Sequence, residues 1–168
     1  MIEKEMVVQE FSEELTLTRK VLMGVPADQL DWTPHEKSMS LGQLATHLAQ
    51  LPGWTGPVLQ ESGLNLAELD EEALAPRSQG PKGILELFDK LAADAQRALE
   101  KVRESAMEDP WTLQSGETEI FTRPRWAVFR QVVMNHIVHH RAQLGLYLRL
   151  LDLPVPPTYG PTADHPQG

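Results

Sequence analysis

The sequence predicts an all-α fold, an up-and-down four-helix bundle with at least one longer crossover connection. Four segments of similar length repeat apolar residues at the three-and-four spacing of an amphipathic helix. Proline and glycine separate these segments, and strands do not alternate with helices as they would in a parallel-sheet fold. The 168 residues, 41% of them hydrophobic, are enough to bury one core. We therefore expect a single domain over residues 1–168, with its helical core at about residues 3–151.

The first predicted helix spans about residues 3–24. Its apolar or small residues recur three or four positions apart, at Val8, Phe11, Leu15, Thr18, Leu22 and Val25. Glutamate and lysine stand between them, so that one face of the helix is apolar and the other is charged. Gly24 and Pro26 end this helix.

The second predicted helix covers about residues 41–59 and follows the stretch DWTPHEKSMS. Either Ser38 or Ser40 can cap the free backbone N–H groups of its first turn. Pro52 and Gly53 interrupt the apolar pattern, so we expect the helix to kink there before it resumes.

The third predicted helix follows a long connection. Residues 60–80 are polar and mixed, and within them LNLAELDEEAL can form a short helical turn before the linker APRSQGPKG. The helix then begins at Pro81 and ends before a break at residues 104–110. Its apolar face consists of Ile84, Leu87, Phe88, Leu91, Ala95, Ala98 and Val102.

The segment WTLQSGETEIFTR, residues 111–123, departs from the helical pattern. Apolar residues flank the Ser-Gly pair at its centre, which predicts a short hairpin or an ordered loop. An isolated hairpin is only marginally stable, so it needs support from the helices. The fourth helix runs from Pro124 to about Leu151. Residues 152–168 are rich in proline and glycine, and we expect an extended tail there.

Composition and charge exclude several classes of function. The chain has 15 Lys and Arg against 24 Asp and Glu, a net charge of -9, and its cations are scattered. Nucleic-acid binding requires clustered cations, so we expect no nucleic-acid partner. The absence of cysteine excludes disulfides and a protein thiolate nucleophile. No apolar run approaches the roughly 18 residues of a membrane span, so we expect a cytoplasmic protein without a membrane partner.

Three histidines lie close together on the fourth helix, in VVMNHIVHHRAQLGLYLRLL. At about 100° per residue, His140 falls near the middle of the apolar stripe and His136 falls close to its edge. These two form an i, i+4 pair, so both rings can reach one ion. Two core-facing imidazoles are costly without a shared partner, because all their ring nitrogens need partners and two charged rings would repel. A metal ion removes that cost.

A third ligand must come from another helix. His47 lies in LGQLATHLAQL on the border of the second helix's apolar face, whereas His35 and His165 lie beside prolines outside the helices. A bundle core can bring one inward histidine against an i, i+4 pair and leave positions open for water or substrate. The sequence therefore favours a metal site of His47, His136 and His140. In the alternative interpretation, His47 is an ordinary helix-border histidine and the pair belongs to a surface or interface patch.

Three more residues are candidates to surround these ligands. Gln43 lies one turn before His47 on the same face, and Arg141 directly follows the histidine pair but points off its stripe. The alternatives for these two are a surface amide and an arginine paired with an acid of a neighbouring helix. His139 lies about 100° from His140, and we expect it beside the ligands or at an interface, not among them.

These stretches resemble the DinB-like (damage-inducible, YfiT-like) family of metal-dependent four-helix bundles. The resemblance rests on LGQLATHLAQL, on NHIVHHRAQLGLYLRLL and on the tail VPPTYGPTAD. The stretch DWTPHEKSMSLGQL is similar to that family's lead-in to its first ligand helix. The matching stretches extend from about Asp31 to Asp164, and the motif of the fourth helix is the most specific of them.

The resemblance implies one divalent metal ion, nickel, zinc or iron, held by His47, His136 and His140 in a pocket at the open end of the bundle. It also implies a homodimer, a small-molecule substrate and, as in characterised relatives, transfer or isomerisation reactions that use a small-molecule thiol. The lack of cysteine is compatible with such a reaction, because the thiol arrives as a cosubstrate.

The site and the resemblance together predict a metal-dependent thiol transferase or hydrolase. A metal held by three neutral imidazoles keeps most of its charge, so it can lower the pKa of bound water to about 7 or hold a thiol as thiolate. The nucleophile then attacks a small electrophile. The alternative is a non-catalytic stress-response or ligand-binding bundle with a structural or vestigial metal site. Structural sites have four protein ligands, and the sequence offers no suitable fourth histidine, which favours an open site.

Overall fold

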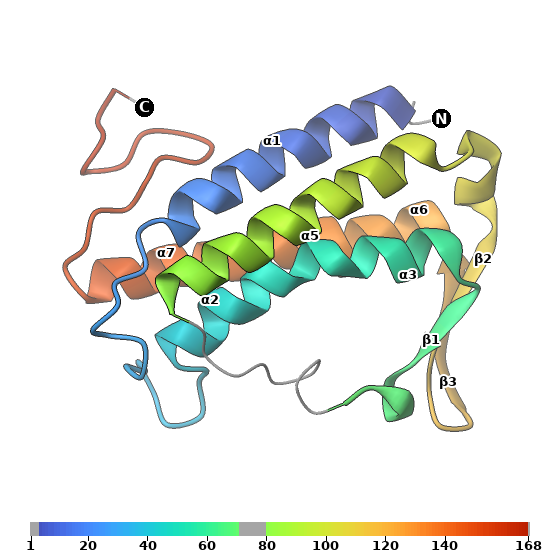
Figure 1. Ribbon diagram of the computed structural model, residues 1–168, viewed down its shortest axis with the longest axis horizontal. Coiled ribbons are helices and arrows are strands. Elements are labelled where there is room, and N and C mark those ends of the chain that lie inside the picture. Colours follow the sequence, from blue (N-terminus) through green and yellow to red (C-terminus); the bar gives the residue numbers. More distant parts are fainter. Residues whose placement is uncertain (1–3, 71–79, 168) are drawn as a thin grey trace.

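The structure is a computed structural model that describes residues 4–70 and 80–167, and it contains four helical rods (Figure 1). The first rod is α1 (Lys4–Leu22) and the third is α5 (Pro81–Lys101). The other two rods are composite. The second consists of α2 (Leu41–Gln50), the 3-10 turn η1 (Leu51–Trp54) and α3 (Thr55–Gln60). The fourth consists of α6 (Arg125–Val128), the π-helical segment η4 (Phe129–Met134) and α7 (Asn135–Leu150).

The predicted four-helix bundle is confirmed, but the up-and-down order of its rods is wrong. Both α1 and α2 pack against α5 and α7, so the first two rods lie at opposite corners of the bundle. The second rod and α5 run in the same direction (Figure 1). The chain leaves α3 at one end of the bundle and enters α5 at the other end. The long crossover that the sequence predicted therefore joins two parallel rods, the second rod and α5 (Figure 1).

Contacts between distant residues agree with these directions. Lys4, at the start of α1, donates to the carbonyl oxygens of Glu100 and Val102 at the end of α5, so these rods are antiparallel. Tyr147, near the end of α7, donates to the carbonyl oxygen of Met39 just before α2. The fourth rod is therefore antiparallel to the second.

Local sequence explains how the second rod begins and where its α-helix is interrupted. Ser40, one of the two predicted caps, accepts a hydrogen bond from the backbone N–H of Gln43, and the Gln43 side chain accepts one from the N–H of Ser40. This reciprocal capping box satisfies two free N–H groups of the first turn. Pro52 and Gly53 lie in the 3-10 turn η1, so the α-helix is interrupted at the predicted position and resumes at Thr55.

The predicted hairpin is present, as β2 (Pro110–Ser115) and β3 (Thr118–Pro124). A third strand, β1 (Gly63–Asn65), pairs in parallel with β2 and was not expected from the sequence. Trp111 of β2 is fully buried, and its indole N–H donates to the carbonyl oxygen of Pro57. The hairpin therefore has the support from the helices that its marginal stability requires.

Part of the connection before α5 can be compared with its prediction. The short helical turn expected in LNLAELDEEAL is the 3-10 turn η2 (Leu66–Glu68). Most of the predicted linker APRSQGPKG lies outside the described residues. A further 3-10 turn, η3 (Glu104–Glu108), occupies the predicted break after α5.

The fourth rod contains a π-helical segment that was not expected from the sequence. Beyond it, the buried residues of α7 are Ile137, Arg141, Leu144 and Leu148. His140 therefore lies at the flank of the buried face and not near its middle. A π-helix holds more residues in each turn than an α-helix, so a stripe extrapolated from Phe129 at α-helical spacing is out of phase beyond η4.

The tail after α7 is extended, as predicted, and polar contacts attach it to the bundle. Arg149 forms an ion pair with Asp164, whose carboxylate also accepts from the N–H of Val155. The hydrogen bond from Arg149 is the main reason why the pKa of Asp164 is lowered to about 2. Among the described helices, none is long and apolar enough to cross a membrane.

Candidate metal centre

The three histidines singled out in the sequence meet where α2 contacts α7. The Nε2 atom of His136 lies 2.9 Å from Nε2 of His140 and 3.5 Å from Nε2 of His47. One ring nitrogen from each histidine lies within 4.8 Å of those of the other two. Three imidazoles from two rods therefore face a common point.

The helices explain this convergence. His136 and His140 are one turn apart on α7, so their rings share one side of the helix, with centroids 4.7 Å apart. His47 comes from α2, which packs against α7. The ring of His47 stands edge-on to the other two, at centroid distances of 5.2 Å from His136 and 4.7 Å from His140.

Two of the three nitrogen separations suit a shared metal ion. Zinc binds histidine nitrogen at about 2.0–2.1 Å, which places neighbouring ligand atoms roughly 2.9 Å apart in octahedral and roughly 3.3 Å apart in tetrahedral geometry. The two Nε2 separations from His136, 2.9 and 3.5 Å, are close to these values. A set of three imidazoles suits zinc, copper, iron or nickel.

Burial keeps the three rings neutral. It is the main reason why the pKa of His47 is lowered to about 4, and the nearby His140 and His136 lower it further. Burial also lowers the pKa values of His136 and His140. Neutral imidazoles can offer their lone pairs to a metal ion, because protons do not compete for them at neutral pH.

A hydrogen bond to the His140 ring determines which of its two nitrogens carries the lone pair. The Nδ1 atom of His140 lies 2.7 Å from Oε1 of Gln143, and a carboxamide oxygen only accepts. Nδ1 is therefore the donor, and the lone pair of the neutral ring is on Nε2. Nothing in the helical period of the sequence distinguishes Gln143 from an ordinary exposed amide, so this contact could not be predicted.

The chain matches a known protein family. The model of the DinB family matches residues 1–167 of the chain. The chain belongs to the DinB family. Comparison with curated proteins finds no match.

Solved structures of DinB-like proteins share the fold. A DinB-like protein from Bacillus cereus is 21% identical, with a TM-score of 0.66 over 90% of this chain and 94% of that one. The DinB-like protein YjoA from Bacillus subtilis is 18% identical, with a TM-score of 0.69 over 92% and 96%. YfiT from Bacillus subtilis, described as a probable metal-dependent hydrolase with an unusual four-helix bundle topology, is 17% identical, with a TM-score of 0.68 over 92% of both chains.

The candidates beside the ligands have different positions in this DinB-family chain. Gln43 is exposed, and its side chain takes part in the capping box at the start of α2. This contact gives Gln43 a structural role at the helix end. His139 is exposed, and its ring stands edge-on to that of His140 at a centroid distance of 4.8 Å. It lies next to the group formed by the other three rings.

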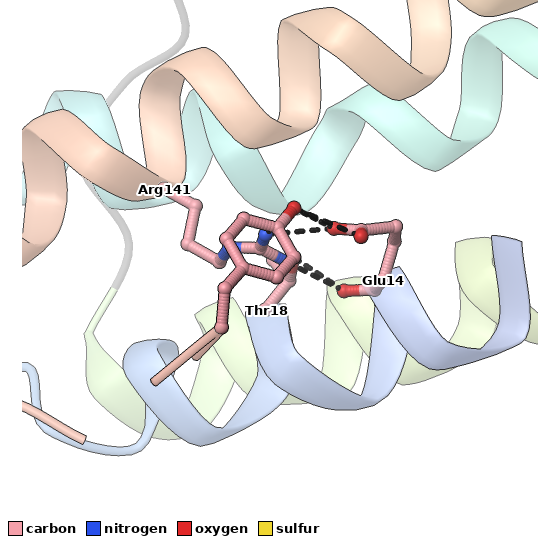
Figure 2. A network of polar contacts seen from close by, with 4 residues as sticks. Glu14, Thr18 and Arg141 are labelled. Atoms are coloured by element: carbon pink, nitrogen blue, oxygen red, sulfur yellow. Dashed lines mark hydrogen bonds and ion pairs between the residues drawn. The ribbon is translucent and has the colours of Figure 1, made fainter. Parts of the chain in front are cut away.

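Arg141 faces away from the histidines. Its side chain is 3% exposed and forms an ion pair of 2.7 Å with Glu14 of α1. Figure 2 shows Arg141 reaching from α7 toward Glu14 and Thr18. The tail joins this network, because the Tyr159 hydroxyl contacts both Arg141 and Glu14. The alternative expectation, an arginine paired with an acid of a neighbouring helix, is therefore the correct one.

A cavity of about 590 Å³ lies elsewhere, among the start of α1, the end of α5, η3 and the first part of the fourth rod. Its apolar lining consists of Val7, Leu99, Met107, Trp126, Phe129 and Met134. None of the three histidines lines it. The pocket that the resemblance implied around the metal is therefore not this cavity.

Proposed function

We propose that this DinB-family protein is a metal-dependent enzyme in which His47, His136 and His140 hold one divalent transition metal ion, nickel, zinc or iron. The observation that carries the proposal is the convergence of three neutral imidazoles from two rods. Because Gln143 leaves Nε2 of His140 without a proton, a cation or the proton of His136 must occupy the 2.9 Å between their Nε2 atoms. The description of YfiT as a probable metal-dependent hydrolase supports the same conclusion.

The three side chains determine what such a site can do. When bound, the ion supplies Lewis acidity that activates a small-molecule thiol or a water molecule at neutral pH. Three protein ligands leave at least one coordination position exchangeable, as in catalytic zinc sites. The imidazoles are neutral, so they do not offset the charge of the ion. The group contains no aspartate or glutamate among the residues that the structure describes.

The exposure of the ligands indicates the side from which a substrate approaches. His47 is buried, whereas His136 and His140 are partly exposed. The site therefore opens along α7, away from the core. We propose that a small electrophile and a low-molecular-weight thiol bind on this side. The reaction either transfers the thiol to the electrophile or uses the thiol to isomerise the electrophile. The chain has no cysteine that could act as the nucleophile.

Metal analysis followed by an activity screen tests this proposal. Protein purified without chelator should carry one divalent metal ion per chain by elemental analysis. His136→Ala should lose the ion, while His139→Ala, the neighbouring exposed histidine, should keep it. Absence of metal from the wild-type protein after it has been offered nickel, zinc and iron would contradict the proposal.

The activity screen separates the nucleophiles. The metal-loaded protein is mixed with small electrophiles, with and without common low-molecular-weight thiols. Turnover that needs thiol and is lost in His136→Ala supports the transferase or isomerase, and turnover without thiol supports the hydrolase. Stoichiometric metal without any turnover would instead support the non-catalytic alternative.

A further inference from the structure

We propose that Gln143 is a positioning residue of the histidine centre, which holds the His140 ring in the tautomer whose Nε2 lone pair faces His47 and His136. This inference rests on the proposed function, because it assigns a role toward the same site.

The geometry of one helix carries the argument. Gln143 follows His140 by three residues on α7, so the two side chains lie on the same side of the helix. Oε1 of Gln143 lies 2.7 Å from Nδ1 of His140. The acceptor oxygen requires a proton on Nδ1, and the opposite ring atom, Nε2, lies 2.9 Å from Nε2 of His136. Gln143 thus holds the proton on Nδ1 of His140 and leaves the lone pair on Nε2, which faces His136.

The tautomer matters because a neutral imidazole carries one N–H and one lone pair. A proton on Nε2 would point at the other two histidines and would have to be displaced before a metal ion could bind. Partners that accept from the second nitrogen of a ligand histidine fix the ring orientation and increase its basicity. Their loss typically lowers metal affinity by about 10- to 100-fold.

The other two histidines lack an equivalent side chain among the described residues. His136 is hydrogen-bonded to the backbone of Val132, one turn earlier. A side-chain substitution at Val132 would not remove this hydrogen bond. The Nδ1 atom of His47 is buried, and no hydrogen-bond partner for it exists in the described part of the chain. Gln143 is therefore the position at which the orientation of a ligand histidine can be tested by substitution.

Metal affinity is the first readout. Gln143→Leu removes the acceptor at an exposed position, and Gln143→Glu keeps an acceptor oxygen. Gln9→Leu is the matched control, an exposed glutamine of α1 that bonds to Glu13 one turn away. Zinc affinity is measured by competition with a chromophoric chelator. Gln143→Leu should bind zinc about 10-fold or more weakly, whereas Gln143→Glu and Gln9→Leu should match or exceed the wild-type affinity.

The second readout needs no metal. In metal-free protein, nitrogen NMR of the imidazole rings should show His140 as the Nδ1–H tautomer in the wild type and as a mixture in Gln143→Leu. A wild-type His140 with its proton on Nε2, or unchanged zinc affinity in Gln143→Leu, would overturn the inference. Failure of the wild type to bind zinc, nickel or iron would overturn the proposed function instead, while the NMR result decides separately whether Gln143 sets the tautomer.

Discussion

Arg141 of α7 and Glu14 of α1 form a buried ion pair, with side chains 3% and 11% exposed (Figure 2). Removal of one partner leaves the other charge buried and unpaired, which costs about 3–5 kcal/mol. We therefore expect Arg141→Met to lower the free energy of unfolding by about this amount, measured by urea denaturation.

Two variants control this first prediction. Arg130→Met removes the more exposed pair with Glu10, and it should lower the free energy of unfolding by about 1 kcal/mol or less. The double variant Glu14→Leu with Arg141→Met should regain most of the stability, because no unpaired charge stays buried. If Arg141→Met lowers the free energy of unfolding no more than Arg130→Met does, the buried ion pair does not have this stabilising role.

The metal-free protein should lose stability in mildly acidic solution. Unfolded histidine has the ordinary pKa of 6.5, whereas burial lowers the pKa of His47 to about 4 in the folded protein. Between these values the unfolded state binds a proton that the folded state does not bind, so the free energy of unfolding falls as the pH falls from 6.5 to 4. For His47 alone the loss is at most about 3 kcal/mol. The lowered pKa values of His136 and His140 act in the same direction.

Urea denaturation of chelator-treated protein across this pH range checks the dependence. His47→Gln should weaken it, and the same substitution at the exposed His165 of the tail should not. An equally steep pH dependence in His47→Gln would show that the proton uptake belongs to other groups.

Two glycines should respond in opposite ways to alanine. Gly63 of β1 lies so close to β2 that a Cβ atom there would overlap the carbonyl oxygen of Thr112. Gly63→Ala should therefore disturb the pairing of β1 with β2 and lower the melting temperature. Gly145 lies inside α7, and a Cβ atom there would meet Cγ1 of Val155 at an ordinary contact distance of 3.6 Å, so Gly145→Ala should stabilise the helix by about 0.5–1 kcal/mol. Thermal melts of both variants test this pair, and equal shifts in the two would refute the close approach of β1.

Regular spacing explains why much of the fold could be predicted. The α5 helix begins at Pro81 and buries Ile84 and Phe88, as its apolar period requires. The pairing of His136 with His140 needs only the geometry of one helix. His47 could be chosen because it alone among the remaining histidines lies on the border of a helix's apolar face, and its ring does meet the pair.

The features that were missed depend on contacts between distant residues. The parallel run of the second rod and α5 depends on the end of the bundle at which α5 begins (Figure 1), and the apolar period of one rod carries no such information. The three residues of β1 are too few to show a period, and they pair with β2 far along the chain. The role of Gln143 becomes visible only once the orientation of the His140 ring is known.

The most direct test of the account is an anomalous-scattering map of crystals grown from zinc-loaded protein. If His47, His136 and His140 share one ion, the map should contain one strong peak at about 2.0–2.1 Å from a ring nitrogen of each histidine. A zinc peak coordinated by other residues, or three imidazoles without a peak between them, would contradict the central claim.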